Sequence, residues 1–221
     1  PHWRQDFATY AVTFRQADSL PASVLERWRR ERDSHIQRAI DNNMPLGTDQ
    51  LKRLAQLHTD RIQEYLDRGE GSCVFRQPRF AELMQNALRH FERERYDLLA
   101  WCVMPNHVHV VFTPYPPHEL GQILKSWQGF TALKINHALG KSGHFWQPEP
   151  YDHIVRDSAD LHHQVRYVLN NPVQAHLSNW TWLGCADWLR GIALKSNVLQ
   201  FHCSLSNASA GARPPTWLRE P

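Results

Sequence analysis

The chain has 221 residues, a mass of 25.9 kDa and a formal net charge of +3, with 42% hydrophobic and 21% charged residues. This length and composition fit one globular domain and exclude a disordered or fibrous chain. The longest apolar run, 98–104, is far shorter than the ~20 residues of a membrane span, so no membrane partner is expected. The first six residues contain no apolar stretch typical of a secretion signal, which favours a cytoplasmic location.

The N-terminal third is predicted to form one strand followed by a polar helical segment. Residues 10–15 alternate apolar and polar side chains, which indicates a half-buried strand. Residues 19–70 show helical spacing of their few apolar side chains and divide at a turn over 44–47. Pro21 begins the first helix, and Thr48 is expected to cap the second.

Helix and strand signals alternate in the middle of the chain. Apolar residues at three- and four-residue spacing over 80–91 predict an amphipathic helix. Two apolar segments, 96–103 and 107–112, predict strands joined by a short turn. A further helix is expected over 120–138, ended by Gly140.

The last third is predicted to contain one strand and one helix. The strand covers 151–156. Asp157 or Ser158 should cap the helix, which is expected to run to Asn170 because Pro172 breaks it.

Without the helical insertion, the order of elements is β-α-β, then β-α-β, then a final helix. This order is that of the ferredoxin-like split βαβ fold, of class α+β, in which an antiparallel sheet carries two helices on one face. The other face is then open to a ligand. We expect a single domain over 7–192, with the helical insertion at about 22–70 and a C-terminal tail at 193–221.

The most informative strand is 107–112, which contains two histidines. Strand periodicity places His107 and His109 on one face and Val108 and Val110 on the other. If the valines pack on the helices, both imidazoles face the open side and can share a metal ion. Two hydrogen-bonded surface histidines are the alternative, and a bare His-x-His motif does not decide between them.

The last helix carries a polar stripe beside its apolar one. His163, Tyr167 and Asn171 follow each other at intervals of four residues. This spacing suggests Tyr167 as a nucleophile and Asn171, through its carbonyl oxygen, as a third metal ligand, with His163 as the alternative ligand. A phenol with a pKa of about 10 is a weak nucleophile and needs a target that a metal has made electrophilic. The apolar stripe that should face the core consists of Leu161, Val165 and Val168.

Several separated motifs resemble those of the REP-associated tyrosine transposases, bacterial relatives of the single-tyrosine insertion-sequence transposases in the HUH endonuclease superfamily. In chain order they are VTFRQADSLP (12–21), MPNHVHVVF (104–112), SWQGFT (126–131), FWQ (145–147), YDHIVRD (151–157) and YVLNNPVQAHL (167–177). The chain departs from the family at His176, where glycine is common, and at Pro150, where glutamate is common.

The resemblance implies a DNA nicking and rejoining enzyme of the HUH type. It assigns His107 and His109 to a divalent ion, Mg²⁺ or Mn²⁺, that polarises the scissile phosphate. The tyrosine of the YxxxNP segment, here Tyr167, would attack the phosphorus and form a 5′-phosphotyrosine bond with a free 3′-hydroxyl. The implied partner is single-stranded DNA or a REP hairpin, bound at the bacterial nucleoid by a monomer, although the insertion-sequence relatives act as homodimers.

The chain has 20 arginines against 5 lysines, together with 9 tryptophans, and this bias suits contacts to phosphates and bases. A solvated helix face is the alternative for the arginines within 27–32, and a core position is the alternative for Trp146. The candidate nucleic-acid-binding residues are Arg15, Arg27, Arg29, Arg30, Arg32, Lys125, Trp146 and Arg156.

Two other functions are compatible with these residues. The first is a sequence-specific DNA-binding protein of the same fold that has lost cleavage. The second is a metal phosphodiesterase in which water attacks and Tyr167 is structural. The transposase is favoured because the nucleophile, the histidine pair and the candidate third ligand are all present.

Overall fold

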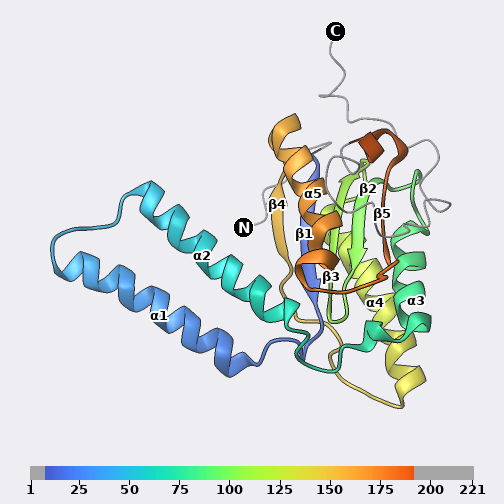
Figure 1. Cartoon of the computed structure of the whole chain (residues 1–221), viewed down its shortest axis with the longest axis horizontal. Helices are drawn as coiled ribbons and strands as arrows, with labels where there is room; N and C mark the ends of the chain where they lie inside the picture. The colour runs from blue at the N-terminus through green and yellow to red at the C-terminus, as the bar shows by residue number, and fades with distance from the viewer. Residues whose placement is uncertain (1–7, 192–221) are drawn as a thin grey trace, which may run out of the picture.

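The computed structural model describes residues 8–191, which form a five-stranded antiparallel sheet with helices on both faces (Figure 1). The strands are β1 (Tyr10–Arg15), β2 (Tyr96–Val103), β3 (His107–Pro114), β4 (Tyr151–Ile154) and β5 (Leu183–Cys185). The helices are α1 (Ala22–Asp41), α2 (Thr48–Asp67), α3 (Pro78–Arg89), α4 (Leu120–Leu139) and α5 (Ser158–Gln174), with 3-10 turns η1 (Val74–Arg76) and η2 (Asp187–Leu189). The predicted domain ends, 7 and 192, and the tail at 193–221 lie outside the described residues. Among the helices of 8–191, none is long and apolar enough to cross a membrane.

The order of the strands confirms the predicted ferredoxin-like α+β fold. The sheet runs β4-β1-β3-β2-β5, with β1 and β3 paired antiparallel throughout β1. Its first four strands have the order that the split βαβ plan produces. The edge strand β5 was not predicted, because three residues are too few to show a period of two.

The apolar face of β3 packs against α3 and α4, as predicted. Val108, Val110 and Phe112 are fully buried in a core that these two helices share with the sheet. Gly140 adopts a left-handed conformation that ends α4, which confirms the predicted end of this helix. Both helices therefore lie on the side of the sheet away from the histidines.

The opposite face of the sheet is not open. α5 lies across it (Figure 1), and its apolar stripe packs on β2 and β3 as predicted. His107 and His109 point to this face and are only 0% and 1% exposed. The prediction that they lie on an open face of the sheet is wrong, because α5 and the C-terminal end of α2 cover them.

The predicted insertion is a helical hairpin, α1 and α2, that projects from the body of the protein (Figure 1). The two helices pack through Trp28, whose ring centroid lies 5.8 Å from that of Tyr65. At its C-terminal end the hairpin joins the sheet, where the amide of Asn106 donates to the backbone carbonyls of Leu66 and Glu70. The end of α2 is thereby fixed beside the start of β3.

Two helix boundaries differ from the sequence prediction. Thr48 is the first residue of α2 rather than its cap, since the preceding glycine is the N-cap. α5 begins after Asp157, whose carboxylate accepts the backbone N–H of Asp160, but it continues through Pro172 to Gln174. Proline removes one helical hydrogen bond, but Pro172 is buried, and its packing keeps the last turn helical.

The edge strand β5 leaves no room for a side chain at Gly184. This residue pairs with Trp101, and an added Cβ would overlap the buried indole ring. We expect Gly184→Ala to destabilise the protein by ~1–3 kcal/mol in urea unfolding, because the ring is enclosed. Gly121→Ala on α4 is the control, since an added Cβ there has nothing within 4 Å. Equal effects of the two changes would contradict this interpretation.

Candidate active site

Two buried imidazoles face each other at the start of β3. The Nε2 atoms of His107 and His109 are 2.9 Å apart, and the two rings are nearly perpendicular, at 87°. An octahedral divalent ion with bonds of ~2.1 Å holds neighbouring ligand atoms ~3 Å apart. The spacing of the two nitrogens therefore fits a shared ion.

Asn106 fixes the orientation of the first imidazole. Its amide nitrogen donates to two backbone carbonyls, at 3.2 and 2.9 Å, so its oxygen faces Nδ1 of His107, at 2.7 Å. Because an amide oxygen only accepts, Nδ1 carries the proton and Nε2 has a free lone pair. A hydrogen bond of this kind supports most histidines that bind a metal.

Thr13 supports the second imidazole from β1. The strand register pairs Thr13 with His109, and its hydroxyl lies 2.7 Å from Nδ1 of that ring. Burial lowers the pKa of His109 to about 3, and burial together with the charge of His109 lowers the pKa of His107 well below its usual range. Both rings are therefore neutral at neutral pH, which is the state that binds a metal.

α5 contributes a tyrosine and an amide to the same place. The ring of Tyr167 meets that of His109 edge-on, with centroids 5.4 Å apart. Asn171, one helical turn later, is 0% exposed, and its Nδ2 has no hydrogen-bond partner in the described part of the chain. Its amide also influences the pKa of His107, His109 and Tyr167 through side-chain hydrogen bonding. β3 and α5 thus bring together the four residues that the sequence placed in the site.

The phenol of Tyr167 is protonated in this environment. Burial raises its pKa above the ordinary value, and the carboxylates of Asp67 and Asp60 act in the same direction. The side chain therefore offers a neutral hydroxyl, which has to lose its proton before or during any attack on phosphorus.

The residues present fit a divalent ion whose third ligand is an amide oxygen. Among residues 8–191, no three His, Cys, Asp or Glu side chains cluster in the manner of a metal site. His163 is exposed on α5, whereas Asn171 is buried beside both imidazoles. Two neutral imidazoles and one amide oxygen form a donor set that accepts a divalent cation.

The inserted helix α2 adds two residues that the sequence did not indicate. Nε2 of Gln63 donates to Asp67 at 2.8 Å and to Oδ1 of Asn171 at 3.2 Å, and it lies 3.4 Å from Nε2 of His107. Burial raises the pKa of Asp67 to about 6. The only sequence signal was a Gln-x-x-x-Asp spacing, which recurs elsewhere in both inserted helices and so could not single out this pair.

A cavity of about 520 Å³ opens between α2, α5 and the sheet beside these residues. Arg15 lies on its wall together with Tyr167 and His109. The other arginine candidates do not line it: Arg27, Arg29 and Arg30 are exposed on α1, Arg32 is paired with Asp33, and Arg156 is exposed after β4. Only Arg15 is therefore brought to the histidines.

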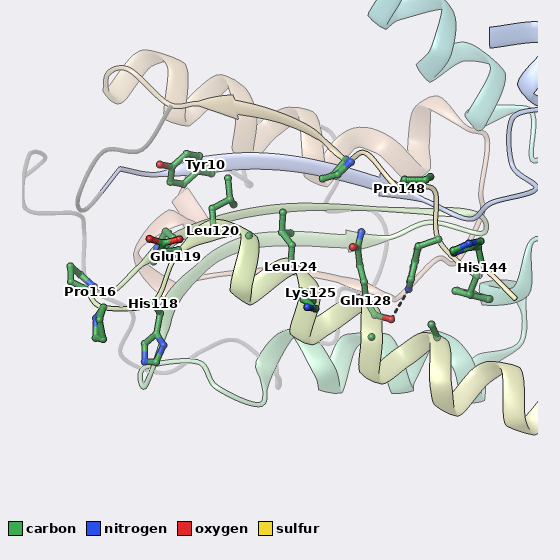
Figure 2. A pocket seen from close by; sticks show the side chains of 18 of the residues that line it. Tyr10, Pro116, His118, Glu119, Leu120, Leu124, Lys125, Gln128, His144 and Pro148 are labelled. Atoms are coloured by element: carbon green, nitrogen blue, oxygen red, sulfur yellow. Dashed lines mark hydrogen bonds between the residues drawn. The ribbon is translucent and has the colours of Figure 1, made fainter. Parts of the chain in front are cut away.

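A second cavity of about 700 Å³ lies along α4, on the other side of the sheet (Figure 2). Lys125 lies on its wall, between Leu124 and Gln128. Trp146 is buried beside Phe14, and its indole N–H donates to the backbone carbonyl of Gln128 at 3.1 Å. This burial supports a core position for Trp146 rather than a base-stacking one.

Comparisons with known proteins agree with the predicted fold and with the predicted family resemblance. Residues 74–171 match the model of the family described as "Transposase IS200 like". The chain is 26% identical over 137 residues to the "REP-associated tyrosine transposase" of Escherichia coli (strain K12), which is 60% of this chain and 79% of that protein. A solved structure titled "Structure of the REP associates tyrosine transposase bound to a REP hairpin" has 16% identity, a TM-score of 0.50 and coverage of 97% of this chain and 96% of that chain. This last likeness supports the fold.

Residues 74–171 are similar to the IS200-like transposases, and the fold and the site are consistent with a DNA nicking and rejoining enzyme of the tyrosine transposase class. Within this class the chain is similar to the REP-associated tyrosine transposases, which confirms the resemblance predicted from its motifs.

Proposed function

We propose that this chain is a metal-dependent endonuclease and strand transferase that cuts single-stranded DNA at palindromic hairpins through a 5′-phosphotyrosine intermediate. One observation carries the proposal. The Nε2 atoms of the histidine pair on β3 lie in the same site as Tyr167 and Asn171 on α5. The similarity to the REP-associated tyrosine transposase, and to a structure whose title names a bound REP hairpin, supports hairpin DNA as the substrate.

His107, His109 and Asn171 would hold a divalent ion, Mg²⁺ or Mn²⁺. When bound, such an ion polarises the scissile phosphate and stabilises the charge that develops on its oxygens. Asn106 and Thr13 keep the two imidazoles oriented, and the hydrogen bond to Asn106 leaves the Nε2 lone pair of His107 available. An amide oxygen is a ligand that hard cations accept.

Tyr167 would supply the nucleophile. Its phenolic oxygen attacks the phosphorus, the bond from phosphorus to the 3′-oxygen breaks, and the 3′-oxygen leaves as a hydroxyl after gaining a proton. The phenolic proton is lost as the new bond forms, because burial keeps the free side chain protonated. The phosphotyrosine bond conserves the energy of the broken linkage, so attack by a 3′-hydroxyl can rejoin a strand.

Arginine side chains would hold the DNA backbone, since a guanidinium group grips a phosphate with two parallel N–H donors. Arg15 would contact the strand nearest the histidines, because it lines their cavity. Further contacts are proposed for the exposed basic residues and for the half-buried Arg32: Arg27, Arg29, Arg30, Arg32, Lys125 and Arg156. From the similarity alone, we also propose that a monomer acts on nucleoid DNA in the bacterial cytoplasm.

A denaturing gel with labelled hairpin DNA and Mg²⁺ tests the proposal. A covalent protein–DNA band that requires the metal is the expected result. Cleaved DNA without an adduct would instead identify a phosphodiesterase that uses water. Retarded DNA on a native gel without any cleavage would identify a binding protein that has lost its activity.

The role of Asn171 predicts a specific metal defect. Asn171→Ala should raise the Mg²⁺ concentration needed for half-maximal cleavage by about 10-fold or more, because one ligand of the ion is lost. Excess Mn²⁺ should restore part of the activity. His163→Ala is the matched control on the same helix, and it should cut at the normal metal concentration. The opposite pattern, a metal defect in His163→Ala only, would make His163 the third ligand.

A further inference from the structure

Three acceptor atoms converge on one point of the site, and the amide nitrogen of Gln63 occupies that point. Oδ1 of Asp67 lies 2.8 Å away, Oδ1 of Asn171 lies 3.2 Å away, and Nε2 of His107 lies 3.4 Å away. The carboxylate and the amide oxygen are acceptors by nature, and the proton on Nδ1 makes Nε2 of His107 an acceptor as well.

An amide group cannot satisfy all three acceptors. Its nitrogen carries two hydrogens, which match the two oxygens and leave the imidazole nitrogen at 3.4 Å without a proton from Gln63. Asp67 is half-buried and forms no ion pair with any residue of 8–191. Arg15 lines the same cavity but forms no ion pair with this carboxylate in the described part of the chain, so a partly buried carboxylate beside two neutral imidazoles is an arrangement that a bound cation would stabilise.

A second pair on the same helix shows that this arrangement is not a general feature of α2. Gln56 donates to Asp60 at 2.8 Å, with the same four-residue spacing and the same hydrogen-bond length as Gln63 and Asp67. Both Gln56 and Asp60 are exposed to solvent, so water satisfies the remaining sites of that carboxylate. Of the two pairs, only Gln63 and Asp67 reach the site, where Gln63 contacts His107 and the amide oxygen of the fully buried Asn171.

We infer that Asp67 of the inserted hairpin is an additional, anionic ligand of the divalent ion, and that the amide of Gln63 holds the place of that ion in the metal-free protein. The inference rests on the proposed function and deepens it. The Gln63 amide stands between Asp67 and the imidazoles, so its withdrawal lets the carboxylate approach the ion. A carboxylate ligand also shifts the donor set toward Mg²⁺ and Mn²⁺, which two imidazoles alone do not favour.

Direct titration of Mn²⁺ into the full chain without DNA tests the inference independently of cleavage. The free Mn²⁺ signal in electron paramagnetic resonance gives the affinity. Asp67→Asn should weaken Mn²⁺ binding by about 10-fold or more, the loss expected for a disturbed metal shell. Asp60→Asn, which removes the same charge from the same helix, should leave the affinity unchanged. Gln63→Ala should bind Mn²⁺ as tightly as the parent protein or more tightly, since no amide has to be displaced.

Folding of the Asp67→Asn variant is checked by thermal unfolding in the presence of a chelator. The folded-state pKa of Asp67, about 6, lies above its unfolded value, so the ionised side chain costs stability once the pH rises above both values. The variant lacks this cost and keeps an acceptor for Gln63, and it should melt no earlier than the parent protein at neutral pH. A weaker Mn²⁺ affinity in this folded variant would therefore report on the ligand.

The outcomes separate this inference from the proposed function. If Asp67→Asn and Asp60→Asn bind Mn²⁺ equally well while His109→Ala does not, the histidine site stands and the inference is wrong. If Gln63→Ala loses the metal, the amide is itself a ligand and does not hold the place of the ion. If the parent protein binds no Mn²⁺, the metal site of the proposed function fails as well.

Discussion

Tyr167→Phe is expected to abolish the covalent protein–DNA adduct while hairpin binding stays within a few-fold of the parent protein. Phenylalanine keeps the ring, which packs edge-on against His109, and removes only the oxygen that would attack phosphorus. Tyr167 is half-buried and its phenol is protonated, so loss of the hydroxyl removes no charge from the site. A denaturing gel measures the adduct, and a native gel with the same labelled hairpin measures binding.

Two other tyrosines are compared with Tyr167 as possible nucleophiles. Tyr151 on β4 is 50% exposed and lines the same cavity as Tyr167, so Tyr151→Phe is the matched variant and should still form the adduct. Tyr96 is buried in the core, where its hydroxyl donates to the carbonyl of Leu88, and burial raises its pKa to about 12. An adduct that persists in Tyr167→Phe and disappears in Tyr151→Phe would place the nucleophile on β4.

The part of the site that the sequence predicted depends on short-range periodicity. A period of two on β3 separates the histidines from the valines, and a period of 3.6 on α5 separates Tyr167 from the apolar stripe. The structure shows both separations, with the valines in one core and the α5 stripe in the other. Such patterns are predictable because each depends on the geometry of a single element.

The covering of the histidines could not be predicted in this way. It depends on how the end of α2 docks on β3, through hydrogen bonds between the Asn106 amide and backbone carbonyls about forty residues earlier in the chain. Every residue has a backbone carbonyl, so the residue types do not show which carbonyls accept these bonds. The four-residue spacing of Gln63 and Asp67 also occurs in an exposed pair, Gln56 and Asp60. The continuation of α5 through Pro172 was missed for a similar reason, since tertiary packing outweighs the local effect of proline.

His107→Ala and His109→Ala are each expected to abolish metal-dependent cleavage and to lower Mn²⁺ affinity beyond the measurable range. Each change removes one of the two nitrogens that lie 2.9 Å apart, and the remaining groups no longer hold an ion in a fixed position. Calorimetric titration of the metal and the denaturing gel measure the two effects separately.

The burial of both imidazoles adds a stability effect to these variants. His107→Ala leaves the buried oxygen of Asn106 without its donor, and His109→Ala leaves the hydroxyl of Thr13 without its partner. The Asn106 side chain is buried, and an unsatisfied buried polar group costs ~1–3 kcal/mol, so His107→Ala should unfold at lower urea concentration than the parent protein. Thr13 is only half-buried, so the corresponding loss in His109→Ala should be smaller. His163→Ala, at an exposed position on α5, should change neither stability nor metal affinity. Unchanged metal affinity in both strand variants, measured where they remain folded, would show that the histidine pair does not bind the ion.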